Sequence, residues 1–222
     1  MPKSPFPLDV FDPDCRSCPR LSQFLDEVKL DYPDYHCRPV EPFGAKQPGL
    51  LIVGLAPGKH GANATGRPFT GDHAGIILYE TLHRFGFSNR PESRARDDGL
   101  KLKRCRITNA VKCLPPENKP TGGEIKTCNA YLQAELAGLK KGAIILALGG
   151  IAHKAVIAAL GLKQAEHPFG HGLIYPLPRE QQLFTSYHCS RYNTQTRRLT
   201  PAMFEKIFSD IRRILDKGKG NH

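Results

Sequence analysis

Four short runs of apolar residues interrupt an otherwise polar chain. They lie at 50–55, 105–111, 143–148 and 183–187. Each run is too short for an ordinary helix and carries β-branched residues, a combination that favours buried strands. The sequence therefore predicts four strands spread along most of the chain.

Helical patterns separate the predicted strands. Thr121 and Glu124 have the spacing of a capping box, and apolar residues follow at helical intervals. Thr200 is a suitable N-cap because Pro201 follows it at the favoured first helical position. A third apolar stripe ends at Gly161, a typical helix terminator. The predicted helices lie at 76–85, 121–139, 151–160 and 200–215.

Alternation of strands and helices predicts an α/β protein with a parallel sheet covered on both faces. Ligands of such sheets bind at the carboxyl ends of the strands. Three places meet that description, namely the loop after Leu55 and the segments around Asn109 and His188. Candidate functional residues are therefore sought there.

Composition narrows the class of protein. The 222 residues, 40% of them hydrophobic, suit one folded domain. No apolar run reaches the roughly 18 residues of a membrane helix, and the first ten residues lack a signal-peptide core. We expect a cytoplasmic protein with no membrane association.

The net charge of +11 is unevenly distributed. Residues 1–50 hold six basic and eight acidic residues, a net charge of −2. Residues 51–222 hold twenty-six basic and thirteen acidic residues, a net charge of +13. A basic body suggests a polyanionic partner such as nucleic acid, and general solubility is the equally weighted alternative.

Four of the seven cysteines suggest a metal site. Cys15 and Cys18 form a C-x-x-C, while Cys113 and Cys128 flank the Pro-rich loop at 114–120. Four thiolates suit a tetrahedral zinc ion or an iron–sulfur cluster, and the spacing does not choose between them. The alternative is that some of these cysteines are ordinary buried thiols.

A glycine-rich segment at 54–72 directly follows the first predicted strand. Its five glycines allow the backbone to approach a ligand closely. A phosphate-binding P-loop does not fit, because the G-x-x-x-x-G-K-[ST] pattern is missing. The dinucleotide pattern G-x-G-x-x-G is also absent from the segment.

Together these segments resemble a known family. Gly-Leu-Ala-Pro-Gly at 54–58 and Gly-Arg-Pro-Phe-Thr-Gly-Asp at 66–72 resemble the first motif of the family 5 (B-type) uracil-DNA glycosylases. The segment 108–116 resembles the middle motif, and 188–194 resembles the last. The order and spacing of the motifs agree, and so do the four cysteines, over most of the chain.

The resemblance implies a three-layer α/β/α sandwich on a four-stranded parallel sheet, built as a single domain over 1–222. A loop-rich leader at 1–48 and a frayed tail at 217–222 complete the expectation. The implied cofactor is a structural 4Fe-4S cluster on the four cysteines, and no catalytic metal is expected. The implied activity is monofunctional hydrolysis of the N-glycosidic bond of uracil, and of other deaminated bases such as hypoxanthine, in DNA.

Three residues carry the implied chemistry. Phe69 is expected to stack on a flipped base, with core packing as its alternative role. Asn109 is expected to read the base edge, since its amide offers a donor and an acceptor, with local backbone bonding as the alternative. His188 is expected to stabilise negative charge on the leaving base. Gly54 adjoins them as a substrate-binding position.

The motif position that usually supplies the water-activating group is apolar in this chain. Better-studied glycosylase families have a polar residue at one of the two positions before the motif proline, where this chain has Leu55 and Ala56. This apolar pair is typical of family 5, and both residues are expected to line the substrate site. Asp72 is the nearest carboxylate and our candidate for a catalytic role, with helix N-capping as the alternative.

The last motif implies contact with DNA, the expected partner of a monomeric protein. Arg191 or Tyr192 is expected to fill the space left by the flipped base, and Arg197 and Arg198 to contact phosphates, with Ser190 opening the segment. A metal-stabilised nucleic-acid-binding module without catalysis is the alternative function. A nucleotide-processing enzyme with a phosphate-binding loop is the third, weakened by the missing P-loop pattern.

Overall fold

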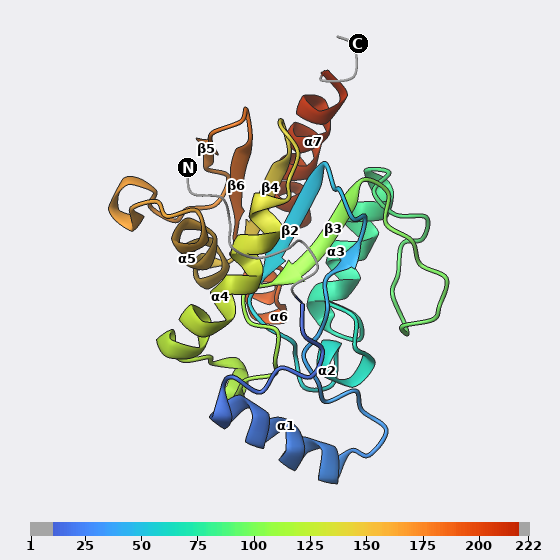
Figure 1. Ribbon diagram of the computed structural model, residues 1–222. Helices are drawn as coiled ribbons and strands as arrows, with labels where there is room; N and C mark the ends of the chain where they lie inside the picture. The colour runs from blue at the N-terminus through green and yellow to red at the C-terminus, as the bar shows by residue number, and fades with distance from the viewer. Residues whose placement is uncertain (1–10, 218–222) are drawn as a thin grey trace.

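A computed structural model describes residues 11–217. Its centre is a sheet of parallel strands in the order β3-β2-β4-β6 (Figure 1). The four strands are β2 (Leu50–Gly54), β3 (Cys105–Asn109), β4 (Ile144–Leu148) and β6 (Gln182–Ser186). The prediction of an α/β fold on four parallel strands is therefore confirmed, with most strand ends displaced by one or two residues.

Two short edge strands were absent from the prediction. β1 (Phe43–Gly44) pairs antiparallel with β3, and β5 (Ile174–Pro176) pairs antiparallel with β6. Neither is long enough to show an alternating pattern, and β5 ends on a proline, which is tolerated at a sheet edge. They extend the sheet to six strands without altering its parallel centre.

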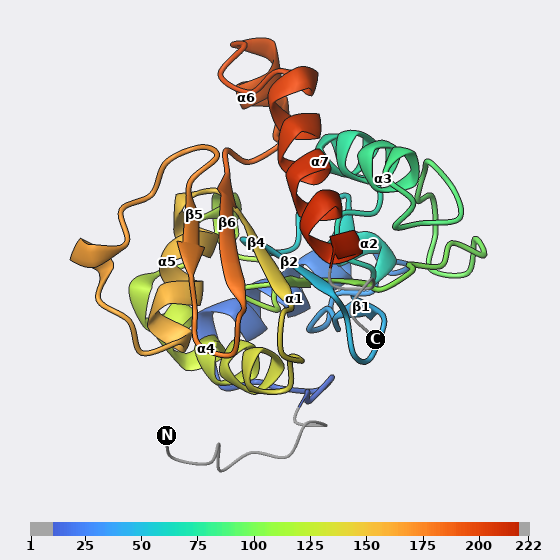
Figure 2. The same ribbon diagram turned by 90° about the horizontal axis from the view of Figure 1, so that it is seen from above.

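Helices cover both faces of the sheet, as Figure 2 shows. One face carries α3 (His73–Arg84) and α7 (Pro201–Lys217), and the other carries α4 (Gly122–Ala137) and α5 (Gly150–Ala159). Alternate strand residues supply two cores. Ile52 packs in the cluster of α3 and α7, whereas the adjacent Val53 packs with α4 and α5.

Two predicted helix starts are confirmed by their caps, whereas the helix predicted at 76–85 begins three residues earlier, at His73 of α3. Thr121 accepts a hydrogen bond from the Glu124 backbone N–H at 3.2 Å, and the Glu124 carboxylate accepts one from the Thr121 backbone N–H at 2.7 Å. At the start of α7, the Thr200 hydroxyl accepts a hydrogen bond from the Met203 backbone N–H at 3.3 Å. These caps satisfy backbone donors that a helix leaves unpaired at its first turn.

The leader contains a helix that the sequence analysis missed, α1 (Pro19–Asp31). Leu21, Leu25 and Val28 form its buried stripe. That stripe packs in a third core with the cysteine-bearing segment beyond β3, which Figure 1 shows beside α1. The remaining helices are short: α2 (Ala62–Thr65), α6 (Arg191–Gln195) and two 3-10 turns at Pro116–Asn118 and Gln164–Glu166.

Within 11–217, no helix is long and apolar enough to cross a membrane. Of the tail expected to fray at 217–222, only Lys217 is described, and it is the last residue of α7. The other five residues, like the first ten of the leader, lie outside the described part of the chain.

Candidate active site

The carboxyl ends of the parallel strands bring the three predicted base-site residues together. Asn109 ends β3 beside Gly54, its register partner at the end of β2. A β-carbon on Gly54 would lie 2.5 Å from Asn109 Oδ1 and 2.7 Å from the Phe69 ring. The Phe69 and His188 rings stack with centroids 5.9 Å apart and an interplanar angle of 24°. Gly54 is therefore required here because a larger residue would displace the amide or the ring.

Phe69 occupies an unusual backbone conformation. Its φ of +58° lies in the left-handed region, which costs free energy for a residue with a side chain. Gly75 of α3 permits it, because a β-carbon there would lie 1.7 Å from the Phe69 carbonyl oxygen. The side chain is 6% exposed and belongs to the core. Core packing and a role at the base site are thus compatible, since the ring also contacts His188 and the Gly54 position.

Asn109 is the buried polar group at the centre of this site. Its side chain is 3% exposed, and its Oδ1 has no hydrogen-bond partner in the described structure. An unpaired buried acceptor is costly and calls for an explanation, such as a ligand that supplies a donor. Because Oδ1 has no partner, the alternative role of Asn109 in local backbone hydrogen bonding is not supported.

His188 follows β6 and is largely buried. Burial lowers the pKa of its imidazole to about 4, so the ring is neutral near pH 7. Its backbone carbonyl accepts a hydrogen bond from Asn193 Nδ2 at 2.8 Å, which ties the residue to α6. A neutral imidazole retains one N–H that can donate to a developing anion.

Asp72 occupies the N-cap position of α3, but its carboxylate makes no capping hydrogen bond. It turns instead into the glycine-rich loop, where β-carbons on Gly58 or Gly61 would lie 2.7 Å and 2.1 Å from its oxygens. Burial raises the pKa of Asp72, opposed by a hydrogen bond from the Ala62 backbone N–H and by nearby His60. The side chain is therefore a partly desolvated carboxylate held by the loop.

The two apolar positions before Pro57 face different surroundings. Leu55 lines a hollow of about 230 Å³ together with His188 and Phe169. Ala56 packs against the third core, which contains α1. Neither carries a group that can bind a proton, so Asp72 remains the carboxylate of the loop.

The predicted DNA-contacting segment forms α6 and the turn after it, projecting from the body in Figure 2. The Ser190 hydroxyl caps α6 by accepting from the Asn193 backbone N–H at 3.4 Å. Tyr192 is 69% exposed, unusual for a large aromatic residue, and Arg191 and Arg197 are also exposed. Arg198 lies with its guanidinium 4.6 Å from the Tyr187 ring centre.

The four predicted ligand cysteines line one cavity of about 220 Å³ between α1, α4 and the segment after β3. Burial and then the other three cysteines raise the pKa of Cys113 to about 12, while Lys112 donates its backbone N–H to Cys128 Sγ at 3.2 Å. Within 11–217, no three His, Cys, Asp or Glu side chains converge as ligands of a preformed metal site. Cys15 and Cys18 of the leader nevertheless line the same cavity as Cys113 and Cys128.

Two features of the site escaped the sequence analysis. Phe169 and Tyr187 lie in the hollow beside His188. Phe169 is on a segment without a recognisable motif, and Tyr187 directly precedes the last motif without belonging to it. Arg67, inside the first motif, is 4% exposed and forms an ion pair with Asp98. The only sequence signal for Arg67 was its position two residues before Phe69.

Residues 41–212 match the family model described as the uracil DNA glycosylase superfamily. A Type-5 uracil-DNA glycosylase from Thermus thermophilus is 46% identical over 205 residues, which cover 90% of this chain and 93% of the relative. One from Mycobacterium leprae is 44% identical over 209 residues, covering 90% and 91%.

A Type-4 uracil-DNA glycosylase from Archaeoglobus fulgidus is also similar, at 28% identity over 199 residues that cover 87% of this chain and 86% of the relative. The match is weaker than those to the type-5 proteins. With its motifs, fold and relatives in agreement, the chain belongs to the type-5 group of the uracil DNA glycosylase superfamily.

Proposed function

We propose that this chain is a monofunctional DNA glycosylase that excises uracil by hydrolysing its N-glycosidic bond and so initiates base excision repair. The observation that carries the proposal is the buried, unpartnered Asn109 amide oxygen beside the Phe69 ring and His188. The names of the type-5 relatives support the same reaction.

Base selection follows from the hydrogen-bonding pattern of the amide. Asn109 Oδ1 accepts from the N3–H of uracil, and Nδ2 donates to O4. Cytosine presents the reverse pattern at these positions, a donor at N4 and an acceptor at N3, so its binding leaves the buried amide mismatched. The Phe69 ring supplies a stacking surface that offsets part of the cost of extracting the base from the duplex.

Bond cleavage leaves negative charge on the pyrimidine ring, close to O2. The neutral His188 imidazole donates its N–H there, which stabilises the transition state more than the ground state. Asp72 acts on the other partner of the broken bond, by orienting the attacking water or stabilising the positive charge on the sugar. Its partly desolvated carboxylate strengthens either interaction.

The base range extends to other deaminated bases such as hypoxanthine. Leu55 and Ala56 present no polar group that rejects a purine edge. Substrate choice then depends mainly on Asn109, whose amide can also pair with the N1–H and O6 of hypoxanthine.

DNA is bound through the basic body and the α6 segment. The segment presents Arg191, Tyr192 and Arg197 to solvent, and residues 51–222 carry a net charge of +13. Phosphate contacts of this kind bind without reading sequence. We propose that the protein works as a monomer on chromosomal DNA in the cytoplasm.

We propose that the cysteine cavity would hold a structural 4Fe-4S cluster. The four thiols that line the cavity of about 220 Å³ are the ligand set such a cluster takes, and the motifs shared with family 5 favour the cluster over a zinc ion. Cys15, Cys18, Cys113 and Cys128 would hold the cluster, which supplies covalent cross-links between leader and body. Iron and sulfide analysis tests this, and stoichiometric zinc without iron would reject it.

The activity test uses a labelled duplex with a single U·G pair, followed by alkali. A monofunctional glycosylase leaves an intact abasic strand that breaks only on alkaline treatment. Strand breakage equal to that of a uracil-free duplex, with DNA binding retained, would instead favour a binding module without catalysis. A second duplex with hypoxanthine tests the broader base range.

A further inference from the structure

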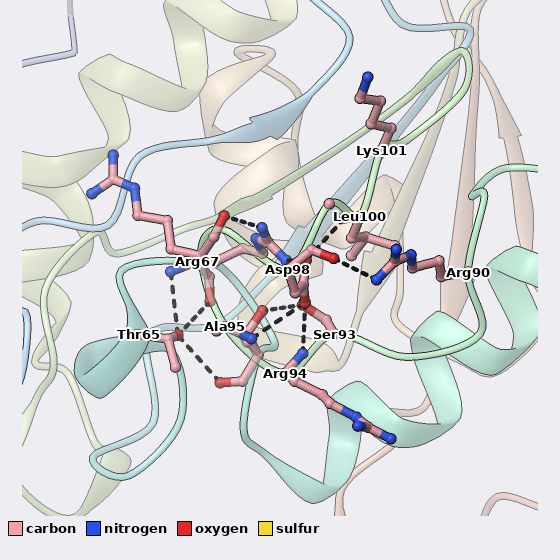
Figure 3. Close-up of polar contacts among 12 residues, drawn as sticks. Thr65, Arg67, Arg90, Ser93, Arg94, Ala95, Asp98, Leu100 and Lys101 are labelled. Atoms are coloured by element: carbon pink, nitrogen blue, oxygen red, sulfur yellow. Dashed lines mark hydrogen bonds and ion pairs between the residues drawn. The ribbon is translucent and has the colours of Figure 1, made fainter.

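A buried arginine lies within the first motif, two residues before Phe69. Arg67 is 4% exposed, and its guanidinium lies 4.6 Å from the Phe43 ring centre. Its Nη1 donates to Asp98 Oδ1 at 2.8 Å and to Ser93 Oγ at 3.0 Å, and its Nη2 donates to the Arg96 carbonyl (Figure 3). All three partners belong to one segment, residues 93–100.

Asp98 organises that segment from within. Its carboxylate accepts backbone N–H bonds from Arg94 at 2.8 Å, Ala95 at 3.2 Å and Leu100 at 2.9 Å. Burial acts to raise its pKa, but Arg67 and these N–H groups outweigh burial and hold the pKa far below its usual range. The carboxylate stays ionised, so the pair with Arg67 is a charge-assisted contact at any working pH.

The same segment contacts side chains on both sides of Phe69. Ser93 contacts Arg67 on one side and, through its hydroxyl, the Thr70 hydroxyl at 2.6 Å on the other. Tyr79 of α3 donates to the Pro68 carbonyl at 2.7 Å. The one residue between these anchors has the left-handed backbone conformation, which persists only where its surroundings enforce it.

Core formation alone does not account for this buried charge. Of residues 93–100, only Leu100 is buried in the core, and the other seven residues add no buried side chain. Burying a guanidinium is costly unless its N–H donors are satisfied. The donors of Arg67 are satisfied by the segment beside Phe69. The contacts of Arg67 are therefore better explained by the neighbouring base site than by the core.

We infer that Arg67 and Asp98 are positioning residues that hold the Phe69 ring in place for the flipped base. The inference rests on the proposed role of Phe69 as a stacking surface. Lysine cannot replace Arg67 fully, because one ammonium group cannot reach Asp98, Ser93 and the Arg96 carbonyl in a planar fork.

The first test is a double-mutant cycle between Asp98→Asn and Phe69→Ala. We measure the single-turnover rate at saturating enzyme on a uracil duplex, together with the affinity for abasic DNA. Asp98→Asn should slow excision roughly 10- to 100-fold, the cost of a displaced group near the reaction, with abasic affinity unchanged. In the Phe69→Ala background it should slow excision less than threefold. Multiplicative effects, or a wild-type rate for Asp98→Asn, would overturn the inference.

Asp97→Asn is the matched control, because it removes the same charge from the exposed neighbouring residue. It should leave the rate unchanged. Ser93→Ala serves as a second variant that breaks both flanking contacts without altering charge, in case Asp98→Asn fails to fold. A Ser93→Ala protein with normal melting and a wild-type rate would count against the inference.

A spectroscopic measurement separates this inference from the proposed function. With 4-fluorophenylalanine at position 69, the fluorine resonance reports the ring's stacking against His188 without any substrate. Asp98→Asn should shift or split that resonance, and Asp97→Asn should not. If Phe69→Ala excises uracil normally, the proposed stacking role fails, yet the fluorine shift still tests positioning. An unchanged resonance would refute positioning even where the excision assay succeeds.

Discussion

The base site and the α6 segment differ in both solvent exposure and charge. Phe69 and Asn109 are 6% and 3% exposed, and His188 is kept neutral by burial. The α6 segment presents arginines to solvent and leaves Tyr192 69% exposed. One region is desolvated and uncharged, and the other is wet and cationic.

The difference teaches how affinity and selection are divided. Charge acts over long distances and on every phosphate alike, so under the proposed function the exposed arginines would bring the protein to any DNA. A desolvated amide or imidazole acts only at contact, and an unsatisfied partner there is expensive. Under the proposed function, selection would belong to the neutral, buried region, and the two regions should respond differently to mutation, pH and salt.

The largest expected effect is from His188→Ala. Loss of one preorganised donor to a developing anion should lower the single-turnover rate about 100- to 1000-fold. DNA affinity should stay within about twofold, because a neutral group contributes no counterion release. Rates on a uracil duplex and fluorescence anisotropy measure the two quantities. His83→Ala in the exposed last turn of α3 is the control, and a His188→Ala rate within threefold of wild type would remove the residue from catalysis.

Asp72→Asn should cause a smaller loss, about 10- to 100-fold near neutral pH. Burial raises the pKa of Asp72, so the wild-type rate should already fall as acidity protonates this carboxylate, above its ordinary pKa. The asparagine variant should lack that fall, because it has no carboxylate to protonate. Single-turnover rates across the acidic range check this. Identical pH profiles for the two proteins would exclude Asp72.

Arg197→Gln should weaken DNA binding by a few-fold and leave the saturated rate unchanged. If the residue contacts one phosphate, the slope of log affinity against log salt should decrease by about 0.9. Anisotropy titrations at several salt concentrations give the slope. Lys163→Gln, at an exposed cation directly before the 3-10 turn that follows α5, is the matched charge control. Equal slopes for both variants would place Arg197 outside the DNA interface.

The smallest effect is expected from Tyr192→Ala. A side chain that fills the space of the flipped base matters only where a partner strand must be kept apart, so excision from duplex should slow about two- to fivefold. Excision from single-stranded DNA should not change. The ratio of the two rates is the measurement, and Tyr32→Ala in the leader is an aromatic control. Equal slowing on both substrates would show that Tyr192 does not act as a wedge.

Periodicity and capping signals sufficed for the centre of the fold. The four parallel strands are buried apolar runs, and the capping box at Thr121 names the start of α4 directly. The helix α1 was missed because its three buried apolar residues lie in a Pro-rich leader that suggested loops. The edge strands have only two and three residues, too few for any pattern.

The candidate site also has parts that the sequence predicts and parts that it does not. Asn109 ends β3 and His188 lies two residues after β6, positions at the carboxyl edge of the sheet where topology alone suggests a ligand site. The pairing of Arg67 with Asp98 was not predictable, because the partners are thirty-one residues apart and Asp98 lies in a polar segment without periodicity. The direction of the Asp72 side chain was equally hidden, since its backbone position alone suggested a cap.

The docking of α1 also bears on the order in which the chain is assembled during synthesis. The helix packs against Val111, Leu114 and Cys128, residues that leave the ribosome some ninety residues after it. The segment that follows α1 supports the glycine-rich loop, through the His36 N–H on the Ala64 carbonyl at 3.0 Å and the Cys37 N–H on the Asn63 carbonyl at 3.1 Å. A nascent chain halted before residue 128 therefore has its first motif but not the completed support beneath it.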